Sequence, residues 1–532
     1  MRSPSPERAA VLRAPVPGAG PAVPPTRQLP AVNRWLTLAV LCVPLLVISL
    51  DNTVLNVVLP TLVRKLHATD SELQWIVDAY VLVFGGLMLV SGSLADRVGR
   101  KRTFMTGLAI FAACSTWAAF SGSATLLIAA RASMGLGATL VMPATLAIIT
   151  NTFGDRTERQ RALGIWAGTT GAGVALGPIV GGLLLAHFAW GSVFLINVPI
   201  ALLGVVAAIR LVPDSRNEHA APPDLAGSLL SVAGLGLVLW AVIEAPAHGW
   251  TSARVLGTGA GGLLALVAFA FRQRRARHPM LRLEFFRRRA FSGAVLSTAT
   301  TMFSLMGALF VLTQFLQFKL GESPLAAGLH MLPAAGGIAL VAPLSSVVVG
   351  RLGTKLTVAT GLTLVAVALW LMSRASVTTA YSGILPGAIL LGVGTGLTVP
   401  AATGSLMSTL PAAHTGIGSA TNGACLNVGG ALGVAIIGSA MATRYAHHLR
   451  PVAATLPGAT AHVARGSLGG ALQVARGIGG EAGARLASVA ERAFMSGMNE
   501  ALLIGALVVM LGVLLAAAIL PLSAPSAQPR GE

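Results

Sequence analysis

The stretch ADRVGRKRTFMTGL at residues 95–108 recurs as VGRLGTKLTVATGL at residues 349–362, an offset of 254 residues. Two further groups of residues repeat at offsets of 257 and 256. They pair Gly135, Gly137, Leu140 and Pro143 with Gly392, Gly394, Leu397 and Pro400, and Gly173, Leu176 and Gly177 with Gly429, Leu432 and Gly433. A nearly constant offset over three segments indicates an internal duplication. The repeat therefore predicts two related halves, 35–211 and 290–521, separated by an insertion at 225–271.

Composition places this repeat in a membrane. Hydrophobic residues make up 54% of the 532 residues and charged residues only 10%, against roughly a quarter in soluble domains. A bilayer core about 30 Å thick requires roughly 20 apolar residues per spanning helix. We therefore expect an all-α integral membrane protein with six spans in each half and two in the insertion. The fourteen expected spans are 35–59, 73–95, 103–122, 125–150, 162–186, 192–211, 225–246, 253–271, 290–317, 325–349, 354–373, 381–409, 416–442 and 499–521.

The distribution of basic residues predicts the orientation of the chain. Of the 37 lysines and arginines, nineteen lie in or at the edges of the loops on one side and six in the tails, while the short loops on the other side hold five. By the positive-inside rule, both termini are cytoplasmic and the long loop at 443–497 is extracytoplasmic. Residues 1–34 and 522–532 are expected to form cytoplasmic tails, the first of them disordered. The net charge of +19, densest at Arg272–Arg289, is interpreted as an orientation signal and a lipid-headgroup contact, not a nucleic-acid site.

No sequence motif indicates an enzyme, a cofactor or a metal site. Cys42, Cys114 and Cys425 fall in expected spans without paired spacing, which indicates neither a disulfide framework nor a thiolate metal site. The sequence contains no zinc-helix motif and no phosphate-binding loop, so ATP-driven transport is not expected. We expect a monomer in the lipid bilayer that is driven by a proton gradient.

A few ionisable side chains fall inside the expected spans, where each costs at least about 2.5 kcal/mol at the bilayer centre and is a functional candidate. At 1.5 Å per residue, Asp51 lies roughly 24 Å from the inner face, while Asp78 and Arg131 lie about 8 to 9 Å from the outer face, which is the same depth. We hypothesise that protonation of Asp51 depends on burial and on Arg131, and that Asp78 faces a cavity and attracts cationic substrate. Trp75 and Tyr80 are further substrate-binding candidates by position. A static buried pair that only orients helices is the alternative for the first aspartate and the arginine.

A glycine pattern marks the fifth expected span. Gly173, Gly177 and Gly181 are four residues apart, with Pro178 and Gly182 beside them. Four-residue spacing produces a helix face without side chains, and proline bends the helix. Ordinary close packing of membrane helices is the alternative explanation. The repeat partner of this span lacks both the proline and the third glycine, so the bend belongs to one half only, which favours a mechanical role.

The loop after the second expected span carries the sequence GSLADRVGRK, which begins at Gly92. Asp96 falls at the C-terminal end of a helix, where the helix dipole disfavours an anion, so it requires a nearby cation. Arg97 and Arg100 supply that charge, and Gly99 permits a sharp turn. A contact that forms only when the cytoplasmic side is closed would bias the conformational equilibrium. The alternative, that the basic run only fixes the topology, explains the arginines but not the aspartate.

Four motifs together resemble the fourteen-span drug:proton antiporters of the major facilitator superfamily. They are LDNTVLNVVLP at residues 50–60, the GSLADRVGRK loop, the fourth-span motif that starts at Arg131, and the glycine and proline pattern of the fifth span. The resemblance covers nearly the whole chain beyond the tails. It implies the major facilitator fold, proton coupling through Asp51 and Arg131, and a cytoplasmic latch centred on Asp96. The chain departs from the repeat pattern at Gly350, which stands where a counterpart of that latch aspartate would be.

These features predict a secondary transporter that exports lipophilic, cationic or amphiphilic compounds in exchange for protons. The two related halves favour alternating access, in which the halves rock about a site near their interface. A proton-coupled uptake symporter on the same fold is the alternative, and the fifth-span pattern argues against it. The chain has four lysines against 33 arginines, a usage that suggests a high-GC bacterial coding sequence and hence a bacterial cell membrane.

Overall fold

The computed structural model describes residues 33–216, 222–277, 279–410 and 415–521. The tails expected at 1–34 and 522–532 lie almost entirely outside the described residues. Within the described ranges the chain forms helices and no strand. The prediction of an all-α chain rich in long apolar helices is therefore confirmed.

The helices follow one another with short connections. The first half contains α1 (Arg34–Leu66), α2 (Asp70–Val98), α3 (Arg100–Ala119), α4 (Ala124–Thr152), α5 (Arg156–His187), α6 (Ser192–Leu195) and α7 (Asn197–Leu211). The insertion contains α8 (Leu225–His248) and α9 (Ala253–Arg275). The second half contains η1 (Leu283–Arg287), α10 (Arg289–Gln314), the π-helical turn η2 (Phe315–Lys319), α11 (Pro324–His330), α12 (Leu332–Met372), α13 (Tyr381–Ser408), α14 (Thr415–Ala453), α15 (Gly458–Gly466), α16 (Leu468–Ile478) and α17 (Gly480–Ile519).

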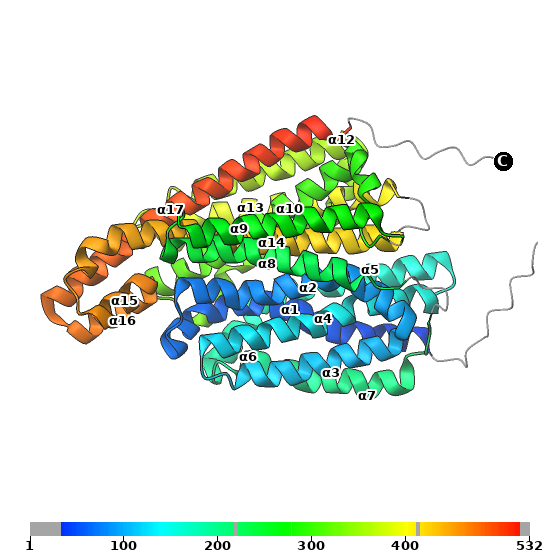
Figure 1. Cartoon of the computed structure of the whole chain (residues 1–532), viewed down its shortest axis with the longest axis horizontal. Helices are drawn as coiled ribbons and strands as arrows, with labels where there is room; N and C mark the ends of the chain where they lie inside the picture. Colours follow the sequence, from blue (N-terminus) through cyan, green and yellow to red (C-terminus); the bar gives the residue numbers. More distant parts are fainter. Residues whose placement is uncertain (1–32, 217–221, 278, 411–414, 522–532) are drawn as a thin grey trace, which may run out of the picture.

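Figure 1 shows two helical bundles side by side, one in blue and cyan and the other in green to red. The bundles meet along α2 and α14, and α8 packs against both of these helices. α9 in turn packs on α8. At one end of the molecule α15 and α16 project beyond the bundles (Figure 1). The inserted pair of helices is therefore attached at the seam between the two halves.

Ten helices in the described part of the chain are long and apolar enough to cross a membrane, and two bent helices, α2 and α5, raise that number to twelve. This count is lower than the fourteen spans expected from the sequence. One of the ten is the 49-residue stretch Pro324–Met372, which is about twice as long as a bilayer requires. This stretch is kinked within α12 at Gly353, whose φ of 78° and ψ of 162° are not helical.

The same turn occurs at two positions that the sequence repeat pairs. Gly99 ends α2 with a φ of 117°, and Gly353 interrupts α12 with a φ of 78°, both values that favour glycine. The Thr103 hydroxyl donates to the Gly99 carbonyl at 2.9 Å, and the Thr357 hydroxyl donates to the Gly353 carbonyl at 2.8 Å. The junction of α2 with α3 and the kink of α12 are therefore built in the same way.

Equivalent glycines also pack against equivalent neighbours in the two halves. A side chain at Gly107 on α3 would lie 2.8 Å from the Gly137 carbonyl oxygen on α4. A side chain at Gly361 on α12 would likewise lie 2.8 Å from the Gly394 carbonyl oxygen on α13. The repeated glycines are thus required because two backbones approach closely at each position.

The long loop expected at 443–497 is largely helical. α14 and α17 extend into it, and α15 and α16 lie between them. The buried Tyr445 hydroxyl donates to the carbonyls of Ala464 at 2.8 Å and Ser467 at 3.1 Å, which holds these short helices against α14. α16 also packs against α1. A segment of the second half therefore covers the end of a helix from the first half.

Candidate functional site

A buried ion pair lies at the centre of the first half. Asp51 on α1 is 0% exposed and Arg131 on α4 is 1% exposed, and the Arg131 guanidinium donates to Asp51 Oδ2. Arg131 Nε also donates to the Ile76 carbonyl on α2 at 3.2 Å. The Arg131 Cζ lies 4.2 Å from the ring centroid of Tyr80, a cation–π contact. A buried pair requires such additional partners, because removing two charges from water is costly.

Asn197 supplies the remaining partner of the Asp51 carboxylate. Its Nδ2 donates to Asp51 Oδ1 at 3.1 Å and to the Ser115 hydroxyl on α3 at 3.2 Å, and the side chain is fully buried at the start of α7. The sequence reasoning missed Asn197, although an amide in an apolar span was a possible signal. Four helices, α1, α3, α4 and α7, are thus joined through one carboxylate.

The glycine face of α5 packs directly on α1 beside this carboxylate. A side chain at Gly173 would lie 2.5 Å from the Leu46 carbonyl oxygen, and one at Gly177 would lie 2.0 Å from the Thr53 hydroxyl oxygen. Gly181 continues the face, because a Cβ there would lie 2.5 Å from a Val54 methyl. Only glycine fits at these positions without moving α1, the helix that carries Asp51.

Pro178 bends α5 at a point that α1 stabilises. The two arms of α5, Thr157–Val174 and Leu176–His187, make an angle of 42°. In a regular helix the N–H of residue 178 would bind the Val174 carbonyl, but proline has no N–H. The Thr53 hydroxyl on α1 donates to this freed carbonyl at 2.9 Å. Thr53 was not singled out in the sequence because nothing in its local pattern indicates a partner on α5.

The opposite side of this part of α5 touches the second half. A side chain at Gly182 would lie 2.6 Å from the Leu325 Cα, and one at Gly328 would lie 2.3 Å from the Pro178 carbonyl oxygen. Leu325 and Gly328 belong to α11. The bent helix is therefore held between α1, next to Asp51, and a helix of the other half.

The three substrate-binding candidates on α2 do not lie together. Tyr80 lies under Arg131, as described above. Trp75 is half-buried and packs in an apolar cluster with Leu239 of α8 and Ala431 of α14. Asp78 is 0% exposed, and within the described residues neither of its carboxylate oxygens has a hydrogen-bond partner. The sequence placed Asp78 at the depth of Asp51 and Arg131. In the structure it lies on a different face of α2 from Tyr80, the residue that contacts Arg131.

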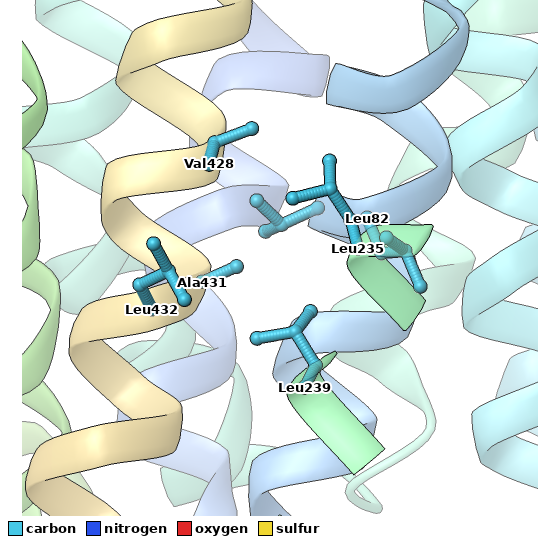
Figure 2. Close-up of a pocket in the computed structure, with 7 residues that line it drawn as sticks. Leu82, Leu235, Leu239, Val428, Ala431 and Leu432 are labelled. Carbon is cyan, nitrogen blue, oxygen red and sulfur yellow. The ribbon is translucent and has the colours of Figure 1, made fainter. Parts of the chain in front are cut away.

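A small apolar pocket lies between α2, α8 and α14, close to Trp75. Its lining consists of Val81, Leu82, Leu235, Leu239, Val428, Ala431 and Leu432. Figure 2 shows Leu82, Leu235 and Leu239 facing the side chains of α14. The pocket has no polar lining residue, so the only recognition it offers is contact with apolar groups.

The GSLADRVGRK loop joins several elements of the first half. Asp96 accepts a hydrogen bond from Arg100 Nε at 2.8 Å. Arg100 also donates to the Ala147 carbonyl of α4 at 3.3 Å, and its backbone N–H donates to the Ser215 carbonyl beyond α7 at 2.9 Å. Arg97 is exposed, and Gly92 faces α4. Among the described residues, the hydrogen bonds of Asp96 and Arg100 reach α4 and residue 215 but no residue of the second half.

Metal binding has no candidate among the described side chains, since no three His, Cys, Asp or Glu residues gather closely enough there. Cys42, Cys114 and Cys425 are free thiols on α1, α3 and α14.

Comparisons with known proteins identify the family of this chain. Residues 41–434 match the Major Facilitator Superfamily. The multidrug efflux pump LfrA of Mycolicibacterium smegmatis is 37% identical over 92% of this chain and 96% of its own length. The methyl viologen resistance protein SmvA of Salmonella typhimurium is 34% identical over 88% of this chain and 95% of its own. The tetracenomycin C resistance and export protein of Streptomyces glaucescens is 34% identical over 77% and 76%.

Solved structures show the same fold at low sequence identity. A bacterial homologue of the human lysosomal transporter Spinster, crystallised in an inward-facing and unoccupied conformation, superposes with a TM-score of 0.64 at 16% identity. That match covers 93% of this chain and 99% of the other. A peptide transporter POT in complex with sulfate superposes with a TM-score of 0.60 at 16% identity, over 92% and 96%. The predicted family is thus confirmed by sequence and by fold: the chain belongs to the Major Facilitator Superfamily.

Proposed function

We propose that this protein is a proton-coupled antiporter that exports lipophilic and cationic drugs, antibiotics or other toxic small molecules by alternating access. Relatives named as multidrug efflux and drug resistance proteins support this proposal. The observation that carries it is the connection from the buried Asp51 and Arg131 pair, through the glycine face of α5, to α11 of the other half. Such a connection couples the charge of a carboxylate to the contact between the halves.

In this proposal Asp51 and Arg131 are the proton-coupling residues. When Asp51 binds a proton, its attraction to Arg131 falls, and Arg131 retains the Ile76 carbonyl and the Tyr80 ring as partners. Asn197 donates to Asp51 in both protonation states, because an amide N–H binds a neutral or a charged carboxyl oxygen. Protonation therefore loosens the bond between α1 and α4, while Arg131 Nε keeps its hydrogen bond to the Ile76 carbonyl.

The bent part of α5 transmits this change. Gly173, Gly177 and Gly181 hold α5 tightly on α1, so movement of α1 moves α5 as well. Pro178 and Gly182 then carry the movement to α11, across the seam between the halves. This assigns the fifth-span glycines a role beyond packing within one half.

We propose that substrate binds near the seam, with Asp78 and Trp75 as the contacting residues, while Tyr80, the third sequence candidate, acts through its contact with Arg131. Burying a carboxylate without a paired cation is costly. Asp78 therefore attracts a positively charged compound that neutralises its charge. Trp75 adjoins the apolar pocket of Figure 2, which suits the lipophilic part of such a compound. The charged part and the apolar part of the cargo are thus recognised on one helix.

The finer topology is also a proposal. Fourteen spans follow if α3 spans the membrane and if α12 counts as two spans on either side of Gly353. Both termini are then cytoplasmic, the halves are 35–211 and 290–521, the insertion is 225–271, and 443–497 is extracytoplasmic, in a bacterial plasma membrane. The tails at 1–34 and 522–532 lie in the cytoplasm. The protein works as a monomer, without cofactor or catalytic chemistry.

The described contacts between the halves fit a conformation closed on the extracytoplasmic side. α11 meets α5, and α16 meets α1, at the end that carries the projecting helices. Asp96 and Arg100 at the opposite end bind each other and α4 of their own half. In this proposal Asp96, Arg97 and Arg100 contact the second half only when the cytoplasmic side closes, and Gly92 and Gly99 allow the close approach.

Transport in inverted membrane vesicles tests the proposal. A fluorescent lipophilic cation should accumulate when an acid-inside pH gradient is imposed, and Asp51→Asn should abolish the accumulation while leaving expression unchanged. Asp214→Asn, at an exposed aspartate, is the matched control. Accumulation that survives collapse of the gradient, or that persists in Asp51→Asn, would reject proton antiport. Gradient-driven movement in the opposite direction would favour the uptake symporter.

A further inference from the structure

A row of buried polar side chains, which we call the file, runs along one face of α2. Asp70, Gln74 and Asp78 are four residues apart, so they lie one above another on that face. All three are buried. Within the described part of the chain, Asp70 Oδ1, Gln74 Nε2 and both carboxylate oxygens of Asp78 have no hydrogen-bond partner. Buried polar groups without partners are rare, so three in one file require an explanation.

Helix α14 forms the opposite wall of this file. The Ser439 hydroxyl donates to Gln74 Oε1 at 3.1 Å across the seam between the halves. Gly438 leaves room for the Gln74 side chain, since a Cβ there would lie 2.7 Å from Gln74 Cδ. One turn further in this antiparallel pair, the buried Ala435 is level with Asp78. The file thus lies in the seam, packed against small residues of α14.

The charged and titratable neighbours of the file gather at one end. Tyr445 of α14 interacts electrostatically with Asp70, and Glu72 completes the capping box that starts α2. Glu244 of α8 accepts a hydrogen bond from Ser71 at 2.7 Å, on the neighbouring face. Asp78 forms the inner end of the file. Among the described residues, no cation forms an ion pair with it. The inner end is therefore an isolated carboxyl group.

We propose that Asp70 and Gln74 deliver protons from the extracytoplasmic end of α2 to Asp78, where a proton and a cationic substrate exclude one another. The inference rests on the proposed antiport and adds, beside Asp51, a second protonation site at Asp78 and the route by which a proton reaches it. A carboxylate that holds either a proton or a cation is the simplest exchange site, because both occupants neutralise the same buried charge.

The spacing of the file suits proton transfer through water. Side chains four residues apart are separated by about 6 Å along the helix, too far for a direct hydrogen bond and right for one bridging water. Asp70 takes a proton from bulk water. The proton passes through water that the free Gln74 amide N–H groups orient, and it ends on Asp78, which leaves Asp70 deprotonated. The file stops there because the next residue on this face is Leu82.

The route is gated by the contact between the halves. In the described conformation Asp70 is buried. Gly466, the last residue of α15, lies against Thr69, the residue before Asp70. The Ser439 to Gln74 hydrogen bond joins the two halves along the route. Separation of α2 from α14 at this end breaks that bond and admits water. The proton therefore enters only when the transporter opens outward.

Two activities measured in the same proteoliposomes test the route. The first is transport of a fluorescent lipophilic cation driven by a pH gradient, and the second is counterflow of the same cation without a gradient, which requires no net proton transfer. Gln74→Leu and Asp70→Asn should reduce gradient-driven transport by about tenfold or more and leave counterflow within about twofold of wild type. Gln74→Glu, which keeps the size and a polar group, should restore driven transport. Ser71→Ala, on the neighbouring face of the same helix turn, is the matched control and should leave both activities unchanged.

The outcomes separate the route from the antiport itself. Driven transport in Gln74→Leu equal to that of an actively coupled wild type would overturn the route and leave the antiport standing. Equal loss of driven transport and counterflow, without rescue by Gln74→Glu, would assign Gln74 to helix packing and also overturn the route. A wild type that ignores the pH gradient would overturn the antiport and the route together.

Discussion

Replacing Gly177 with alanine tests the mechanical connection between α5 and α1. The new Cβ would lie 2.0 Å from the Thr53 hydroxyl oxygen and 2.9 Å from the Leu50 carbonyl oxygen, so the two helices must separate. Such overpacking costs about 1–3 kcal/mol. Gly168→Ala is the matched control, because that position lies on the same helix with nothing within 4 Å. Both variants gain up to about 1 kcal/mol of helix propensity, so the difference between them isolates the contact.

The assay compares the apparent Tm of the purified variants and their gradient-driven transport. Gly177→Ala should melt below Gly168→Ala, and its transport should fall about 100-fold, because a displaced α1 carries Asp51 away from Arg131. Adding Thr53→Ala to Gly177→Ala should not restore the Tm, because it removes the nearest atom but also unpairs the Val174 carbonyl, at a similar cost of about 1–3 kcal/mol. If Gly177→Ala were as thermostable and as active as Gly168→Ala, the proposed connection would be wrong.

Two further predictions concern polar contacts. Asn197→Leu removes the amide that donates to Asp51 Oδ1, so it should cost about 1–3 kcal/mol of stability and shift the pH profile of transport, and an unchanged profile would exclude Asn197 from coupling. Burial raises the pKa of Asp224, but hydrogen bonds from Arg272, the Gly227 N–H and Gln273 outweigh it and hold this pKa below its ordinary 3.8. The stabilisation is therefore present above that value and lost as pH falls through the lower folded-state pKa, so Asp224→Ala should lower the apparent Tm at neutral pH, by an amount that shrinks below about pH 4. A Tm difference that stays constant with pH would contradict this assignment.

Much of the fold was readable from the sequence because membrane helices are long and the chain repeats itself. Gly99 and Gly353 were paired by the repeat, and both adopt a positive φ with the same threonine contact. The depth estimate put Asp51 and Arg131 at one level, and they form an ion pair in the structure. These predictions worked because they depend only on distance along a helix, which the sequence specifies.

The contacts that depend on how helices face one another were not predictable. Asn197 and Thr53 are neutral polar residues, and nothing in their local sequence names Asp51 or the Val174 carbonyl as partners. Asp78 was expected at the depth of Asp51, but it lies on a different face of α2 from Tyr80, which contacts Arg131. Depth along a helix does not determine which way a side chain faces around the helix axis. Helix rotation is set by packing against neighbours, and a single sequence does not reveal those neighbours.

The hydrogen bond from Thr53 to Val174 makes the residue types at positions 53 and 178 depend on each other. With any residue other than proline at position 178, its N–H would satisfy the Val174 carbonyl, and Thr53 would need only the Leu50 carbonyl, which it approaches at 3.3 Å. A proline gained without the hydroxyl would leave a buried carbonyl unpaired, at a cost of about 1–3 kcal/mol. A proline at position 178 is therefore tolerated best when residue 53 carries a hydroxyl. A chimaera between related transporters should therefore keep the first and fifth helices from the same parent.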